Sequence, residues 1–140
     1  MLRTILSVVA GIVVAFAIVF ASDALFHALI PSAPPPADTG DREAMGAYVA
    51  GQPSSVLVAL LAGWTLAAFA GSALAARLAR RGEWPGWVVT SLFLFATAAN
   101  FLMVPHPSWM VTLGVAAILV AGWAGSRIGA RTAPRVPHSS

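Results

Sequence analysis

The stretch Trp84–Ser126, WPGWVVTSLFLFATAANFLMVPHPSWMVTLGVAAILVAGWAGS, decides the fold, because it contains no Asp, Glu, Lys or Arg. It is about twice as long as the roughly 20 apolar residues that one membrane-spanning helix needs. Pro105-His106-Pro107 interrupts it near its centre. Proline lacks a backbone N–H and restrains the preceding residue away from helical geometry. The stretch therefore predicts two transmembrane helices, 86–104 and 108–128, joined by a tight turn.

The composition of the whole chain indicates the same class of protein. Of its 140 residues, 59% are hydrophobic and 9% are charged, and the mean hydropathy is +0.83. A soluble domain carries about 25% charged residues, so this chain has too few for a surface that faces water. Cysteine is absent, which excludes disulfides, thiolate metal sites and cysteine nucleophiles.

Two further apolar runs predict two more spanning helices. The first covers 4–29, where the only acidic residue is Asp23, and the second covers 56–78, after GQPSS at 51–55 interrupts the uncharged sequence. A cleaved signal peptide is the alternative for the first run, but its apolar core is longer than the usual 7–15 or so residues. We therefore expect an all-α, four-helix transmembrane bundle with up-down topology, one domain over 1–130 and a flexible cytoplasmic tail over 131–140.

The arginines predict the orientation of this bundle. In an alternating topology, seven of the eight arginines fall on one side of the membrane: Arg3, Arg77, Arg80, Arg81, Arg127, Arg131 and Arg135. The exception is Arg42, which stands among acidic residues in the loop 31–55. The positive-inside rule then places both termini in the cytoplasm and the loop outside. Because the arginines form no basic stripe, membrane orientation explains them better than nucleic-acid binding.

The extracytoplasmic loop 31–55 divides into two parts. PSAPPP at 31–36 is proline-rich and should be extended. DREAMGAYVAG at 41–51 predicts a short helix that is capped near Thr39 or Asp41 and stopped at Gly51.

Small residues spaced by four indicate where the spanning helices approach one another closely. They form three rows: Ser7, Gly11 and Ala15; Gly63, Ala67, Gly71 and Ala75; and Ala117, Ala121, Gly125 and Gly129. We expect four glycines to carry helix packing: Gly11, Gly63, Gly71 and Gly125.

The first row, continued by fours, reaches Asp23 and His27, and the predicted spans place Asn100 and His106 at the same membrane level. A buried carboxylate is costly unless it is paired. One interpretation is a structural pair, in which Asp23 points into the bundle within hydrogen-bonding reach of His27 or Asn100. A second is a metal site formed by Asp23, His27 and His106. Proton handling and simple exposure at the membrane interface are the remaining interpretations.

Several segments together resemble a family of small bacterial inner-membrane proteins with four predicted spans and no assigned activity. The segments are DALFHALIPSAPPP, YVAGQP, the Gly/Ala-rich second span ending in arginines, and NFLMVPHPSWM. They cover about residues 1–130, and the family pattern favours glutamate where Asp23 stands. The resemblance implies a multi-pass protein of the bacterial inner membrane and a shared extracytoplasmic polar site built from Asp23, His27, Tyr48, Asn100, His106 and Trp109.

The leading functional hypothesis is a non-enzymatic accessory or scaffold subunit, because the second to fourth spans carry no charged residue apart from the arginines at their ends. The alternative is a small-molecule or metal-binding membrane protein, or an enzyme, that uses the extracytoplasmic Asp/His/Asn cluster. We expect the lipid bilayer as partner, together with a homo-oligomer or a larger membrane complex. No cofactor is indicated.

Overall fold

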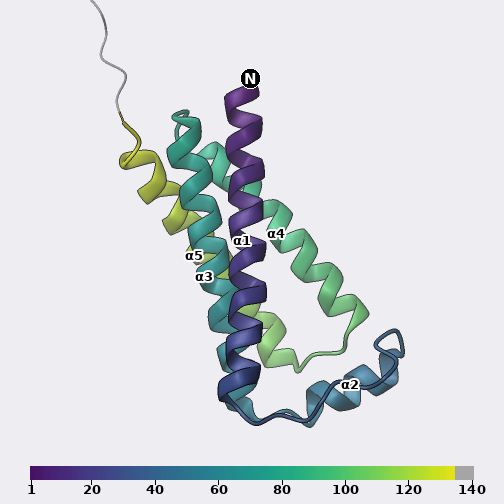
Figure 1. The fold of residues 1–140 in the computed structure, drawn as a ribbon. Coiled ribbons are helices and arrows are strands. Elements are labelled where there is room, and N and C mark those ends of the chain that lie inside the picture. Colours follow the sequence, from purple (N-terminus) through teal and green to yellow (C-terminus); the bar gives the residue numbers. More distant parts are fainter. Residues whose placement is uncertain (135–140) are drawn as a thin grey trace, which may run out of the picture.

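The computed structural model describes residues 1–134, and in that range it contains five α-helices and no strand. The helices are α1 (Leu2–Leu29), α2 (Arg42–Ala50), α3 (Ser54–Ala79), α4 (Trp84–Met103) and α5 (Ser108–Arg131). All except α2 are long and apolar enough to cross a membrane. They alternate in direction, so the N-terminus and the end of α5 lie at the same end of the molecule (Figure 1). The predicted all-α, four-helix bundle is confirmed, and the chain is an integral membrane protein.

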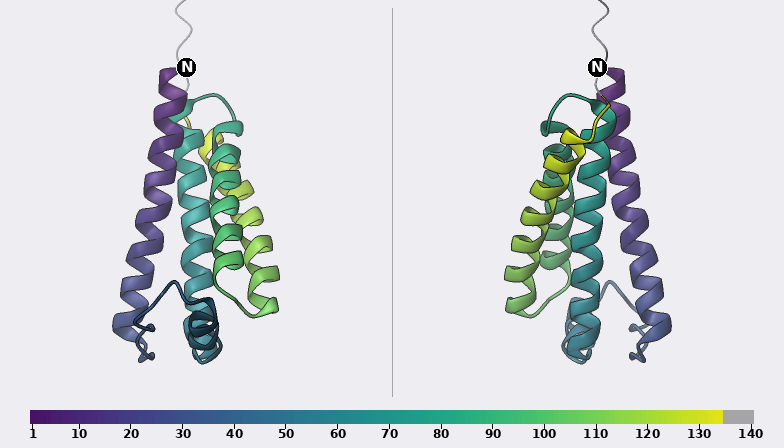
Figure 2. Two further views of the ribbon diagram at one scale, coloured as in Figure 1. Left: turned by 90° about the vertical axis from the view of Figure 1, so that its right-hand side faces the viewer. Right: turned by 90° about the vertical axis from the view of Figure 1, so that its left-hand side faces the viewer.

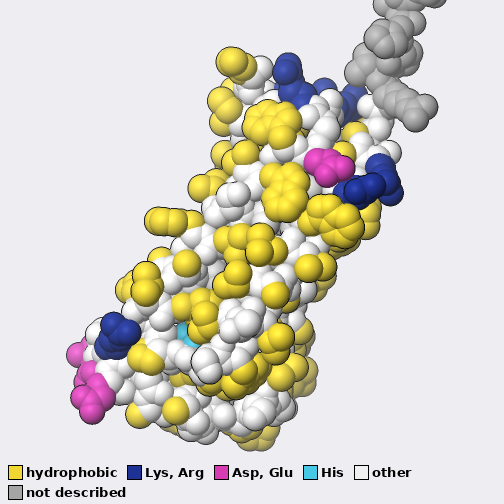
Figure 3. Space-filling view, turned by 180° about the vertical axis from the view of Figure 1, so that it is seen from behind, with side chains coloured by type: hydrophobic (Ala, Val, Ile, Leu, Met, Phe, Trp, Pro, Cys, Tyr) yellow, Lys and Arg dark blue, Asp and Glu magenta, His cyan; other side chains and the backbone are white. Residues whose placement is uncertain are grey.

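The bundle has two chemically different ends. We call the end with the N-terminus and the last turns of α3 and α5 the arginine end, and the end with α2 and the α4–α5 turn the α2 end. Charged side chains gather at both ends, and a largely apolar band separates them (Figure 3). At the arginine end, Arg3 Nε donates a 2.8 Å hydrogen bond to the carbonyl of Leu78, so this side chain joins α1 to the last turn of α3.

The spanning helices extend slightly beyond their expected bounds at the arginine end. α1 begins at Leu2 rather than at 4, and α5 continues to Arg131 rather than ending at 128. Arginine is a good helix former and is favourable in the last turn of a helix, where its charge meets the helix dipole. Arg131 therefore belongs to α5 and not to the expected tail 131–140, of which residues 135–140 lie outside the described range.

α3 is the central helix of the bundle. It packs extensively against α1 and α5 and less against α4, so α1 and α5 lie on different sides of it (Figure 2). Its buried residues are mostly small: Gly63, Ala67, Ala68, Gly71, Ser72, Ala75, Ala76 and Ala79. A transmembrane helix with small residues on more than one face can receive several neighbours at short range.

The predicted packing glycines lie where neighbouring helices approach closely. Gly11 of α1 lies against Gly71 of α3, and a Cβ built on Gly63 would lie 2.8 Å from Cβ of Ser22 in α1. On the other side of α3, a Cβ on Gly125 of α5 would meet the carbonyl of Phe69. Any larger side chain at these positions would push the helices apart.

A junction of buried hydroxyl groups joins α3, α4 and α5. Ser72 Oγ and Thr90 Oγ1 lie 2.8 Å apart, and Thr90 also donates to the carbonyl of Gly86 at 3.0 Å. Gly122 of α5 leaves the space that the Thr90 side chain fills. The hydroxyl of Ser126 donates to the carbonyl of Gly122 at 2.7 Å. Thus each of these three hydroxyls has a hydrogen-bond partner within the protein.

α2 closes one end of the bundle. Asp41 caps it, because its Oδ1 accepts from the backbone N–H groups of Glu43 (2.9 Å) and Ala44 (3.2 Å). The helix ends before Gly51, as the sequence predicts. A Cβ built on Gly46 would lie 3.1 Å from the Pro105 ring, so α2 packs across the α4–α5 turn.

Candidate functional site: the α2 end and two grooves

The side chains of the expected polar cluster do not all meet at the α2 end. Asp23 is half-buried and His27 is exposed. Within residues 1–134, no hydrogen bond links Asp23 to His27 or to Asn100. In the same range no group of three or more His, Asp or Glu side chains is placed to hold a metal ion. The expected triad of Asp23, His27 and His106 is therefore not assembled.

The reason is the rotation of α1. Each step of four residues turns an α-helix by about 400°, so a row spaced by four drifts by about 40° at every step. Asp23 lies about 160° around the helix from Ser7, although the row connects them. The face of α1 that is buried against α3 continues from Ala15 to Ser22, which lies against Gly63, and to Phe26, not to Asp23 and His27 as expected.

His106 belongs to an aromatic cluster instead. Its ring centroid lies 5.0 Å from that of Phe101 and 6.2 Å from that of Trp64. Nδ1 lies 2.7 Å from the carbonyl oxygen of Val104, and because a carbonyl can only accept, Nδ1 carries the proton and donates this hydrogen bond. The side chain therefore stabilises the α4–α5 turn.

The remaining residues of the expected cluster are spread over the α2 end. Tyr48 of α2 packs against the hydrophobic core, and Trp109 is partly exposed in the first turn of α5. Gln52, between α2 and α3, was not singled out by the sequence. Its Oε1 and Nε2 are buried and have no hydrogen-bond partner among residues 1–134. A buried, unpaired amide costs about 1–3 kcal/mol of folding free energy.

A first groove, the α1–α4 groove, lies between these two helices with α3 as its floor. Its volume is 220 Å³, and it is lined by Phe16, Val19, Phe20, Trp64, Phe93, Ala96, Thr97 and Asn100. Phe16 and Phe93 meet edge to face at 6.2 Å. Asn100 is the most polar lining residue, and its amide makes no hydrogen bond among the described residues. The groove thus combines apolar walls with one free amide.

Asp23 and His27 continue the α1 wall of this groove. At about 100° per residue, Phe16, Phe20, Asp23 and His27 fall within about 60° of one another around α1. Asp23 follows Phe20 by about one turn and His27 follows by about two, both toward the α2 end. Asp23 and His27 therefore share a face of α1 with the groove, and not with the row of small residues that begins at Ser7.

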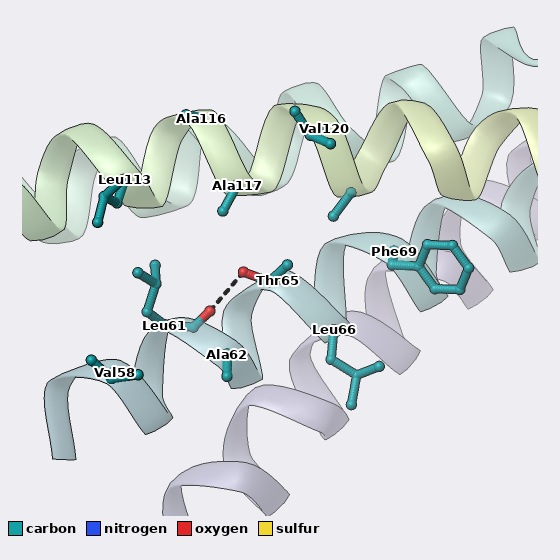
Figure 4. Close-up of a pocket in the computed structure, with 11 residues that line it drawn as sticks. Val58, Leu61, Ala62, Thr65, Leu66, Phe69, Leu113, Ala116, Ala117 and Val120 are labelled. Atoms are coloured by element: carbon teal, nitrogen blue, oxygen red, sulfur yellow. Dashed lines mark hydrogen bonds between the residues drawn. The ribbon is translucent and has the colours of Figure 1, made fainter. Parts of the chain in front are cut away.

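A second groove, the α3–α5 groove, lies on the other side of α3. Its volume is 820 Å³, and it is lined by Val58, Leu61, Ala62, Thr65, Leu66, Phe69, Leu113, Ala116, Ala117, Val120 and Ala121. Figure 4 shows α5 running across α3, with the small side chains of Ala62 and Ala117 between larger ones. Thr65 donates its hydroxyl to the carbonyl of Leu61 at 2.8 Å, so the only polar lining side chain is already satisfied.

The α3–α5 groove follows from where the two helices cross. Gly125 and Gly129 contact the backbone of Phe69 and Ala73, so the helices are closest near the arginine end. Toward the α2 end they diverge around Leu113 and Val58, and the wedge between them forms the groove. The row of small residues in α5 predicts helix packing, and its second half, Gly125 and Gly129, makes the close contact with α3.

The two grooves are the strongest candidates for function, since they are concave, lie at membrane depth and differ in polarity. The signals that could have located the first were Thr97 and Asn100, four and seven residues after Phe93 on one side of α4. Comparison with known proteins adds no further assignment. The chain matches no protein-family model, no curated protein and no solved structure.

Proposed function

We propose that this protein is a non-enzymatic accessory or scaffold subunit of the membrane, and that its α3–α5 groove receives a transmembrane helix of a partner. The observation that carries the proposal is the shape and lining of this groove. Its volume is 820 Å³, it is open to the side, and alanines at 62, 116, 117 and 121 leave the backbones of α3 and α5 accessible. Transmembrane helices associate through such small-residue surfaces, where close packing replaces the hydrophobic effect.

The rest of the bundle supports a scaffold role because it is held in one arrangement. Glycines contact backbone on both sides of α3, through Gly11 and Gly125, and the Ser72–Thr90 pair ties α3 to α4. Packed helices with such contacts act as a rigid body. The groove is therefore formed before a partner arrives, which lowers the ordering cost of association.

A photo-crosslinking amino acid at Ala117, in the groove, tests the proposal in the membrane of the producing cell. Phe95 of α4 is the matched control, because it is 76% exposed on a helix that does not line this groove. We expect a discrete cross-linked species from position 117 that position 95 does not give. Mass spectrometry of the purified adduct then identifies the partner, and an adduct with a second copy of the chain means a homo-oligomer.

Filling the groove provides the second arm of the test. Ala117→Leu should abolish the adduct from a crosslinker placed at the neighbouring Val120, while Ala98→Leu, an exposed change on α4, should leave it intact. The same adducts from positions 117 and 95, or no adduct from either, would show that lipid alone occupies the groove.

The proposal includes the orientation and the membrane. Both termini lie in the cytoplasm of a bacterial inner membrane, supported by the six arginines at 3, 77, 80, 81, 127 and 131 that lie at one end of the bundle, against Arg42 at the other. It also includes membership of the small four-span family, which rests on DALFHALIPSAPPP and NFLMVPHPSWM.

A further inference from the structure

We infer that the α1–α4 groove binds a single-chain amphiphile with an ammonium head group, with the chain between α1 and α4 and the head group at Asp23 and Asn100. This site is independent of the α3–α5 groove, so it goes beyond the accessory role.

The groove has room for part of one hydrocarbon chain, and the rest of the chain would extend into the bilayer. Its volume is 220 Å³, compared with about 150 Å³ for a protein cavity that binds benzene. Phe16, Phe20 and Phe93 belong to the wall, and the edge-to-face pair of Phe16 and Phe93 lies on the side of the arginine end. The groove opens sideways between α1 and α4, so a chain enters it from the bilayer.

The polar groups lie toward the α2 end of the groove. The Thr97 hydroxyl is engaged, since it donates to the carbonyl of Phe93 at 2.9 Å. The Asn100 amide is not engaged by any described residue and offers its carbonyl oxygen as an acceptor. A ligand that fits therefore has its donors at the end nearest α2.

Asp23 supplies the charge that selects the head group. It lies on the same face of α1 as Phe16 and Phe20, and it is half-buried with no ion pair or hydrogen bond among residues 1–134. A carboxylate near the membrane is costly unless it is paired. An ammonium group at this position would form a charge-assisted hydrogen bond with it.

The other charged side chains at the α2 end also favour a cationic head group. The α2 end carries four carboxylates, of Asp23, Asp38, Asp41 and Glu43, and one guanidinium, of Arg42. Acidic and basic side chains lie together at this end in Figure 3. The resulting negative potential raises the local concentration of cations and disfavours fatty acids and other anionic amphiphiles.

The test uses the full chain in vesicles of a neutral phosphatidylcholine, so that the lipid contributes no net charge. A diazirine-bearing dodecylamine is photo-crosslinked, and the labelled peptides are mapped by mass spectrometry. We expect label on residues 16–23 of α1 and 93–100 of α4, and competition by unlabelled dodecylamine but not by dodecanol or dodecanoate.

Three variants separate the site from general attraction to the surface. Asp23→Asn keeps the size and the hydrogen-bonding capacity of the side chain. It should raise the concentration of dodecylamine that halves the labelling by about ten-fold, as expected for losing one charged hydrogen bond. Ala96→Phe fills the groove and should remove the label from both segments. Asp38→Asn removes an equal charge at the same end but outside the groove and should change neither result.

Each contrary result overturns the inference. Equal competition by amine and alcohol, or label that survives Ala96→Phe, would mean ordinary contact with annular lipid. An equal effect of Asp38→Asn and Asp23→Asn would mean surface electrostatics alone. Competition by dodecanoate rather than by dodecylamine would reverse the assigned charge of the head group. The variant Ala117→Leu, in the α3–α5 groove, should be labelled like the wild type, which distinguishes this site from the proposed partner interface.

Discussion

Gly11 of α1 and Gly71 of α3 face each other backbone to backbone. A Cβ built on Gly11 would lie 2.5 Å from the carbonyl oxygen of Gly71, and one built on Gly71 would lie 2.6 Å from the carbonyl oxygen of Gly11. No side chain fits in that space, so the crossing of α1 and α3 depends on both residues being glycine. Val89 of α4 reaches the same point, since its methyl groups lie 3.0 and 3.4 Å from the two built Cβ atoms.

Gly71→Leu should therefore destabilise the bundle. Overpacking costs about 1–3 kcal/mol, and the better helix propensity of leucine returns less than about 1 kcal/mol of that. Thermal unfolding in mild detergent measures the loss. Ala98→Leu, which adds bulk on the exposed face of α4, is the control and should leave the unfolding temperature nearly unchanged. Equal unfolding temperatures for Gly71→Leu and the wild type would contradict the crossing.

The Ser72–Thr90 hydrogen bond should give a measurable coupling between α3 and α4. A double-mutant cycle with Ser72→Ala and Thr90→Val should yield about 0.6 kcal/mol, the average for interhelical hydrogen bonds in a membrane protein. Thr112→Val provides the control, because the Thr112 hydroxyl is exposed and bonds within its own helix to Ser108. Zero coupling between Ser72→Ala and Thr90→Val would show that the two hydroxyls are not hydrogen-bonded to each other.

Gln52→Met should raise the stability of the protein or leave it unchanged. The substitution keeps an unbranched side chain and removes two buried polar atoms that have no partner among residues 1–134. Relief of an unpaired amide contributes up to about 1–3 kcal/mol. Chemical unfolding of the two proteins in the same detergent gives the difference. A loss of stability would mean that the amide is hydrogen-bonded in the membrane.

Asp41→Ala should loosen the first turn of α2 without unfolding the spans. The Asp41 side chain satisfies the backbone N–H groups of Glu43 and Ala44, and loss of such a cap costs about 0.5–2 kcal/mol. Hydrogen exchange at these two amides should accelerate, while amides in α3 keep their protection. Asp41→Asn, which keeps a capping oxygen, should exchange at nearly the wild-type rate; fast exchange there would assign the effect to charge instead.

The orientation of the bundle is testable with reporter fusions. A reporter joined after residue 140 should report a cytoplasmic location, and one inserted at Gly40, before α2, should report an external location. The opposite pattern would reverse the assignment from the arginines. The absence of cysteine from the chain allows an independent check with a single engineered Gly40→Cys and an impermeant thiol reagent.

The sequence by itself determined the number of spans, their approximate ends and the capped helix α2. These features depend on local properties: a run without charges, the prolines around His106, the carboxylate of Asp41 and the stop at Gly51. Each feature affects only the few residues next to it in the sequence, so it can be recognised without knowing which helices pack together. The glycines at 11 and 71 were likewise visible as small residues in apolar helices.

Only the tertiary structure decided which faces of the helices meet. A drift of about 40° in every four residues carries Asp23 and His27 away from the ridge that begins at Ser7, so a row in the sequence does not keep to one face of a long helix. The Ser72–Thr90 pair joins residues on different helices and required the angle at which α3 and α4 pack. The α3–α5 groove exists because α5 touches α3 closely near the arginine end and diverges from it toward the α2 end, and crossing angles are a property of side chains packed in three dimensions.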